Sequence, residues 1–88
     1  MDIQIKKSFS KDIVKIVDKK LLNSILEIIT NIQQAASIKE IKHAKKMEGS
    51  KKHYRIKIGH FRMGLYIEDK TVFIVRFLHR KDIYKYFP

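Results

Sequence analysis

Three strand-like runs between residue 53 and the C-terminus constrain the fold more than any other feature of this 88-residue chain. The runs "YRIKI" and "FRMGLYIE" alternate apolar and polar residues, which is the period of a strand with one buried face. The run "TVFIVRFL" is nearly continuous in apolar residues, which is typical of a central strand covered on both sides. The sequence therefore predicts a three-stranded antiparallel meander.

Gly59 and His60 separate the first two runs, and a glycine supplies the positive φ that a type II′ turn requires at its first central position. A two-residue turn at this point places Lys57 opposite Arg62. The same register divides the hairpin into an apolar face (Tyr54, Ile56, Ile58, Phe61, Met63, Leu65 and Ile67) and a polar face (Arg55, Lys57, Arg62 and Tyr66).

The polar face of this hairpin gathers cations that a purely structural sheet could avoid. Like charges opposed across a strand pair are destabilising by roughly 0.2–1 kcal/mol per pair. Three cations on one face suit a phosphate-binding site, and Gly64 opposite Arg55 would let a ligand approach the backbone. The alternative is an ordinary solvated face whose cations prevent edge-to-edge aggregation.

The N-terminal region predicts a short edge strand in "MDIQIKK", followed by a helix. Ser10 is a suitable N-cap with Asp12 in the first turn, so the helix is expected to begin at Ser10 or Lys11. Phe9 can pack on Val14 as a hydrophobic staple. The apolar stripe of this helix consists of Ile13, Val14, Ile16, Val17 and Leu21.

A second amphipathic helix is expected to end near Ala36. Its apolar residues recur at three- and four-residue spacing, as in a helix with one buried face. No glycine or proline interrupts Lys19 to Asn23, so one long kinked helix is an alternative to a hairpin of two helices, which fits a compact domain better. The repeating residues are Leu22, Ile25, Leu26, Ile29 and Ile32.

The segment from Ser37 to Lys52 has no clear periodicity and reads as a surface connection. It is either a solvated, partly flexible loop or a docking surface for a polyanion. The segment contains six lysines and only two acidic residues, Glu40 and Glu48. The lysines are Lys39, Lys42, Lys45, Lys46, Lys51 and Lys52.

These elements predict one domain of the α+β class over residues 1–88, because a chain of this length buries a single modest core. The expected order is an N-terminal strand, a helical hairpin, a three-stranded antiparallel meander and a short C-terminal helical turn after Arg80. The helices are expected to cover one face of the sheet.

The net charge narrows the classes of partner. Lysine and arginine outnumber aspartate and glutamate 20 to 9, giving a formal charge of +11 that a polyanion or an acidic protein is expected to neutralise.

Cysteine is absent, which excludes thiolate metal sites, and the histidines have no metal-ligand spacing, so no metal or other cofactor is expected. No segment is long enough to span a membrane and no signal peptide is visible, so we expect a cytoplasmic protein without a membrane partner. The histidines are His43, His53, His60 and His79.

The C-terminal half, with "YRIKIGHFRMGLY" followed by "RFLHRKDIY", resembles the RelE/ParE superfamily of toxins from bacterial type II toxin–antitoxin systems. The ending "HRKDIY" is the most specific part, whereas the helical half matches in pattern only. RelE-type members cut messenger RNA in the ribosomal A site, without metal, through attack of a ribose 2′-hydroxyl on the adjacent phosphate. ParE-type members share the fold, lack the cation cluster and poison DNA gyrase.

The resemblance implies a catalytic set on the polar face of the hairpin and in the tail. Arg55 and Lys57 correspond to the sheet cations, and Arg62 to the cation that stabilises the transition state. Arg80 corresponds to the C-terminal cation, and Tyr84 to the aromatic residue that stacks on a base.

One departure from the family pattern concerns the general base. RelE-type members have two lysines where this chain has Arg55 and Lys57, and an arginine does not give up its proton. The base is therefore expected to be Lys57 with a lowered pKa, or His79. Arg80 or His79 would assist departure of the 5′-oxygen.

The resemblance therefore predicts a ribosome-dependent mRNA endonuclease toxin whose partners are an antitoxin, ribosomal RNA and messenger RNA. The protein is expected to be a monomer when free and part of a hetero-oligomer with its antitoxin. The six lysines between Ser37 and Lys52 would dock on the ribosome. Two alternatives remain, a gyrase poison without nuclease activity and an inactive relative that only binds its antitoxin.

Overall fold

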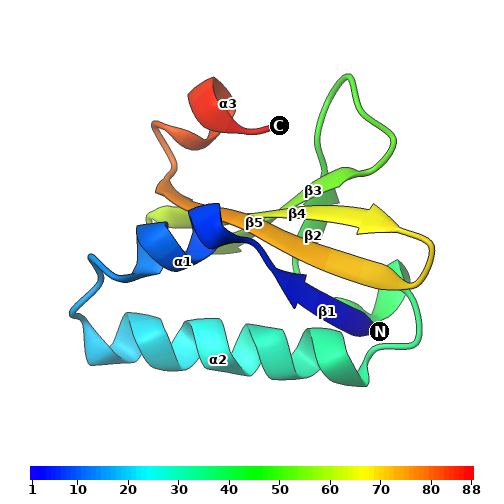
Figure 1. The fold of residues 1–88 in the computed structure, drawn as a ribbon, viewed down its shortest axis with the longest axis horizontal. Coiled ribbons are helices and arrows are strands. Elements are labelled where there is room, and N and C mark those ends of the chain that lie inside the picture. The colour runs from blue at the N-terminus through cyan, green and yellow to red at the C-terminus, as the bar shows by residue number, and fades with distance from the viewer.

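A mixed five-stranded sheet with helices on both faces makes up the computed structural model, which describes all 88 residues (Figure 1). The strand order is β1-β5-β4-β3-β2; β1 is parallel to β5 and every other pair is antiparallel. The predicted α+β class is confirmed. The strands are β1 (Asp2–Ile5), β2 (Ala44–Lys46), β3 (His53–Ile58), β4 (Phe61–Glu68) and β5 (Thr71–His79), and the helices are α1 (Lys7–Ile13), α2 (Lys19–Gln34), the 3₁₀ turn η1 (Ile38–Glu40) and α3 (Ile83–Tyr86).

The predicted hairpin register is confirmed at the turn between β3 and β4. Gly59 has a φ of +57°, and the first pair beyond the turn joins Ile58 to Phe61. Lys57 therefore lies opposite Arg62, as the two-residue turn requires. The alternation of "YRIKI" and "FRMGLYIE" places the apolar residues on the face that packs against α2 and the cations on the other.

The main hydrophobic core lies between the sheet and α2. Ile56, Met63 and Leu65 are completely buried there, together with Ile32 of α2. A second, smaller cluster lies on the opposite face, where α3 covers part of the sheet (Figure 1). The sequence predicted helices on one face only, whereas the structure has helices on both faces. The second cluster consists of Met47, Ile83 and Phe87, packed against Val75 and Leu78 of β5.

Helix α1 begins earlier than the sequence predicted, and the predicted hydrophobic staple is wrong. The N–H of Lys6 still donates to the carbonyl of Ile74, so the helix starts directly where β1 stops pairing with β5. Phe9 is buried within α1, whereas Val14 is 80% exposed. Val17 is 88% exposed, so neither valine belongs to an apolar stripe.

Two separate helices are present, which confirms the helical hairpin and excludes the single kinked helix. The break lies at Val14–Asp18 rather than between Lys19 and Asn23, because Asp18 caps α2. Its carboxylate accepts hydrogen bonds from the N–H groups of Lys20 at 2.9 Å and Leu21 at 3.3 Å. An aspartate at this position satisfies two of the free N–H groups of a helix N-terminus.

The connection between Ser37 and Lys52 contains η1 and the edge strand β2, neither of which the sequence predicted. Strand β2 is only three residues long, and two of them are lysines, so it carries almost no strand signal. It pairs Lys45 with Arg55 and Lys46 with Tyr54 of β3.

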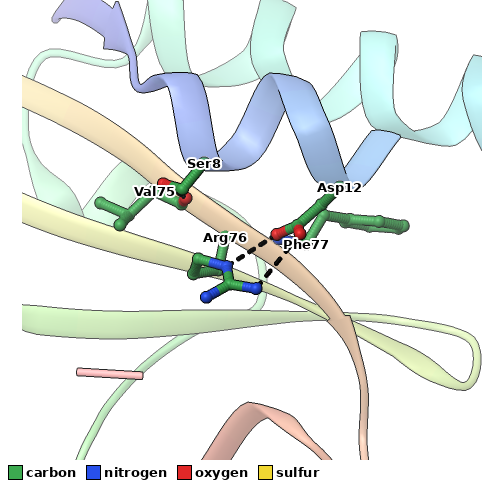
Figure 2. A network of polar contacts seen from close by, with 5 residues as sticks. All are labelled: Ser8, Asp12, Val75, Arg76 and Phe77. Atoms are coloured by element: carbon green, nitrogen blue, oxygen red, sulfur yellow. Dashed lines mark hydrogen bonds and ion pairs between the residues drawn. The ribbon is translucent and has the colours of Figure 1, made fainter. Parts of the chain in front are cut away.

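Helix α1 covers the part of the β5 edge that β1 does not reach (Figure 2). The hydroxyl of Ser8 donates to the carbonyl of Val75. The carboxylate of Asp12 accepts hydrogen bonds from the N–H of Phe77 at 2.9 Å and from Nε of Arg76 at 2.8 Å. Side chains of α1 thus complete the hydrogen bonding of a strand edge.

None of the helices is long and apolar enough to cross a membrane.

Candidate functional site

The sheet face on the side of α3, called the outer face below, carries the predicted cations. Arg55 and Lys57 of β3 and Arg62 of β4 all point to this face, because they alternate with core residues along their strands. Strand β2 adds a cation that the sequence did not assign here, since Lys45 lies directly opposite Arg55. One row across the sheet therefore reads Lys45, Arg55, Gly64 and Arg76.

Arg62 occupies an unusual environment for a cation. Its Nη1 donates to the carbonyl oxygens of Gly59 at 3.0 Å and Phe61 at 2.8 Å, while its buried Nε has no hydrogen-bond partner. Burial and the nearby charges of Arg55 and Arg80 lower the pKa of Arg62, and no carboxylate pairs with it. The guanidinium is thus fixed in orientation and lacks a counter-anion, which is how a cation prepared for a phosphate would be held.

The tail brings Arg80 and Tyr84 to the same region. The N–H of Arg80 donates to the carbonyl of His60 at 2.8 Å, which ties the start of the tail to the β3–β4 turn. Helix α3 is anchored by the buried side chains of Ile83 and Phe87, while Tyr84 remains 62% exposed. Tyr84 lines the same pocket as Arg55, and the charges of Arg55 and Arg80 reach Arg62. Arg55, Arg62, Arg80 and Tyr84 therefore form one cluster on the outer face.

The sequence suggested that Gly64 would let a ligand approach the backbone, but the structure leaves no room for one there. The Cα of Gly64 faces the ring of Phe87, and a Cβ added there would lie 2.9 Å from two carbons of that ring. The predicted space opposite Arg55 is thus filled by the chain's own C-terminal segment, and Gly64 is small because Phe87 packs against the backbone. This contact confirms that one aromatic residue of the tail packs into the structure.

Replacing Gly64 with alanine is expected to destabilise the protein by about 1–3 kcal/mol through overpacking against Phe87. The φ of Gly64 is outside the positive region, so the backbone accepts alanine and the contact alone carries the effect. Urea unfolding of Gly64→Ala, Phe87→Leu and the double variant measures it. The double variant should lose less free energy than the sum of the single losses, because a smaller side chain relieves the clash; strict additivity would contradict the contact.

His79 lies on the opposite face from Arg62. It is paired with Phe61, and both side chains point to the face that packs against the helices. Its ring meets Phe61 edge-on at 5.7 Å between centroids and stacks on His60 at 6.3 Å, and its Nδ1 accepts the N–H of Lys81. Of the two predicted candidates for the general base, only Lys57 shares the outer face with Arg62.

The six predicted docking lysines are all exposed, but they do not form one surface. Lys45 and Lys46 line a pocket of about 440 Å³ with Arg55 and Tyr84. Lys42 and Lys57 line a separate hollow of about 390 Å³ between α2 and the end of β3. Lys39 lies in η1 and Lys51 in the β2–β3 loop, and Lys52 forms an ion pair with Glu68 at 3.3 Å. The pKa of Lys52 is raised, mainly by the hydrogen bond that its ammonium group donates to the carboxylate of Glu68 and also by the negative charge of that carboxylate.

Arg76 is a cation of the outer face that the sequence analysis missed. Its partner Asp12 is 64 residues away, so no local pattern identified the pair, although an arginine within the apolar run of β5 was a signal. The hydrogen bonds that Arg76 donates to the carboxylate of Asp12 raise the pKa of Arg76. The guanidinium carbon of Arg76 lies 6.0 Å from the ring centre of Tyr86 in α3. The structure contains no group of three histidine, cysteine, aspartate or glutamate side chains that could hold a metal ion.

Comparison with known proteins decides the family. Residues 3–84 match the model of a family described as the ParE toxin of the type II toxin–antitoxin system, parDE. The whole chain is also 37% identical, over 89 residues, to Toxin RelE3 of Methanocaldococcus jannaschii and covers all of that protein. The chain belongs to the RelE/ParE superfamily of type II toxins. The superfamily predicted from "HRKDIY" and the hairpin is thereby confirmed.

Solved structures of superfamily members agree with the fold. The toxin in the RelB–RelE antitoxin–toxin complex from Methanococcus jannaschii has a TM-score of 0.78 at 35% identity; the match covers 96% of this chain and 98% of that one. A RelE–RelB complex from Pyrococcus horikoshii OT3 matches with a TM-score of 0.72 at 22% identity, over 90% of this chain and 93% of that one. At that lower identity the likeness concerns the fold alone.

Proposed function

We propose that this toxin cleaves messenger RNA on the translating ribosome, in the A site, without a metal ion, and that an antitoxin holds it inactive. The observation that carries the proposal is the unpaired Arg62 guanidinium, fixed by two carbonyls beside Arg55, Arg80 and Tyr84. Three arginines without a carboxylate partner stabilise a phosphate that gains negative charge in the transition state. The chemistry needs ribosomes, so the proposal includes the cytoplasm as the site of action.

In the proposed reaction, the ribose 2′-oxygen attacks the adjacent phosphorus and the bond to the 5′-oxygen breaks. Lys57, acting as its neutral amine, takes the 2′-hydroxyl proton; its location opposite Arg62 on the outer face supports this role, whereas His79 faces the other side. Arg55 and Arg62 stabilise the phosphate oxygens, and Arg80 stabilises charge on the departing 5′-oxygen, which water protonates. Tyr84 stacks on a neighbouring base.

The proposed antitoxin partner is supported by the solved relatives. The Methanococcus jannaschii and Pyrococcus horikoshii proteins are complexes of RelE with RelB. A net charge of +11 suits both an acidic segment of an antitoxin and ribosomal RNA, which would compete for the same face. The free toxin is proposed to be a monomer and the inhibited form a hetero-oligomer.

A gyrase poison is the second candidate function. It is favoured by the match to the family model that is described as the ParE toxin. A protein of that kind has no need for an arginine held at two carbonyls beside two further arginines. The two candidates differ in target, so a DNA supercoiling assay with purified gyrase separates them from the same protein preparation.

The deciding experiment adds the purified protein to a cell-free translation reaction and maps the 5′ ends of the message by primer extension. New ends at defined codon positions, only while ribosomes translate, are expected. The control is the same message with the protein and no ribosomes. An intact message would contradict the proposal, and loss of supercoiling activity by gyrase would then support the second candidate.

A further inference from the structure

Strand β1 is the outermost strand on one side of the sheet, and its outer edge is unpaired (Figure 1). It runs parallel to β5, so alternate residues of β1 bond to β5. The N–H groups of Asp2 and Lys6 are both bonded on the β5 side, at 3.1 and 2.9 Å. The N–H and C=O groups of Ile3 and Ile5 therefore point to the free edge, where no loop or helix of the chain bonds them.

The residues with free backbone groups also present an apolar surface at this edge. Ile3 and Ile5 lie opposite Val72 and Ile74 of β5, which are completely buried, so both point to the face that packs against α2. Ile3 is partly covered there, whereas Ile5 is 52% exposed. A further strand added to this edge would satisfy the backbone groups and cover the exposed isoleucine.

The sequence of this edge is complementary to itself. In "DIQIK", antiparallel pairing about Gln4 sets Asp2 opposite Lys6 of a second copy, and Ile3 opposite Ile5. The two Ile3–Ile5 pairs exchange their N–H and C=O groups, because these residues face the edge. Asp2 and Lys6 then fall in the pairs without hydrogen bonds, where side chains are closest and opposite charges are favourable.

The other edge of the sheet lacks this complementarity. Strand β2 is three residues long and ends in Lys45 and Lys46, so pairing with a second β2 would bring lysines of both copies together. Like charges across a strand pair are destabilising, and short lysine-rich strands commonly protect an edge from association. The edge of β1 is not protected in this way, because Asp2 offsets Lys6 when two copies pair.

We infer that two copies of this toxin associate through antiparallel pairing of β1 with β1, which joins their sheets. The contact is short, so it belongs to the small and weak class of interfaces, with a dissociation constant on the order of 100 µM. A dilute toxin therefore stays monomeric, and the pairing matters where two toxins are held close together, as in a hetero-oligomer with antitoxins. The arginines of β3 and β4 lie away from this edge, so the contact does not depend on the proposed reaction.

Sedimentation equilibrium of the purified free toxin, from about 1 to 500 µM, tests the pairing. The wild-type toxin is expected to change from monomer to dimer over this range. Asp2→Lys opposes lysines in both symmetric pairs and Lys6→Asp opposes aspartates, so each variant alone should associate about tenfold more weakly or less. An equimolar mixture of the two variants restores opposite charges in both pairs and should form a mixed dimer with near wild-type affinity.

Matched controls separate the pairing from net charge. The double variant Asp2→Lys/Lys6→Asp keeps the net charge of +11 and reverses each pair, so it should associate like the wild type. Lys15→Asp changes the same charge at an exposed residue outside β1 and should alter the association less than twofold. Amide hydrogen exchange of Ile3 and Ile5 should slow as the concentration of the wild-type toxin rises.

Two results of these measurements would overturn the inference. One is a wild-type toxin that stays monomeric over the whole range, and the other is a mixture of the charge variants that associates no better than either alone. Amides of Ile3 and Ile5 that become protected only in the complex with the antitoxin would assign this edge to the antitoxin instead. Because no RNA is present, none of these outcomes bears on the proposed cleavage of messenger RNA.

Discussion

Arg62→Ala is expected to lower the rate of ribosome-dependent mRNA cleavage by about 100- to 1000-fold. Removing one preorganised donor from a charge-stabilising site costs a factor of this order. The effect should fall on the rate at saturating toxin, because Arg62 is proposed to act on charge that develops during the reaction. The measurement is single-turnover cleavage of a message on stalled ribosomes, quantified by primer extension.

Two comparisons separate the chemistry of Arg62 from its structural contacts. Arg62→Lys keeps a positive charge but loses the planar group held by Gly59 and Phe61, so it should recover only part of the rate. Urea unfolding should show a loss of about 1–2 kcal/mol for Arg62→Ala, since two hydrogen bonds at a turn are removed. A well-expressed Arg62→Ala protein that still arrests growth would end the catalytic assignment.

The hairpin was predictable from sequence because its signals are local. Gly59 marks a two-residue turn, and that turn fixes which residues pair on either side. Once the register is set, period-two alternation decides that Lys57 and Arg62 share a face. The central part of the candidate site follows from these two rules, and the observed pairs agree with them residue by residue.

Long-range contacts account for what the sequence analysis missed. Gly64 is covered by Phe87, and Asp12 contacts Arg76 and Phe77, over separations that no periodicity spans. The same contacts explain the shifted helix start: Ser10 and Asp12 look like a cap, but the carboxylate of Asp12 serves the edge of β5 instead. Local propensity is overridden wherever a side chain has a better partner elsewhere in the fold.

Asp12→Ala is expected to reduce the free energy of unfolding by about 2–3 kcal/mol, the largest effect on stability that we predict for a polar residue. The carboxylate satisfies three donors at once: Nε and Nη2 of Arg76, at 2.8 and 3.2 Å, and the N–H of Phe77, at 2.9 Å (Figure 2). The side chains are 12% exposed for Asp12 and 26% for Arg76. Water can therefore replace only part of what is lost.

Denaturant unfolding of a small set of variants measures the contribution of this pair. Asp12→Asn keeps an acceptor but not the charge, so it should lose about half as much as Asp12→Ala. Glu27→Ala removes an exposed carboxylate from α2 and should change stability by less than about 0.5 kcal/mol. A double-mutant cycle with Arg76→Ala isolates the pair and should give a coupling of about 1–2 kcal/mol.

The Asp12–Arg76 pair should also affect the C-terminal segment, because Arg76 contacts both Asp12 and the ring of Tyr86. Freed from Asp12, the guanidinium no longer has a fixed position under α3, and the segment that carries Tyr84 loses one of its supports. Amide hydrogen exchange of Ile83 to Phe87 should therefore accelerate in Asp12→Ala more than in Glu27→Ala. Unchanged exchange in a destabilised Asp12→Ala protein would confine the pair to joining α1 and β5, with α3 held by Ile83 and Phe87 alone.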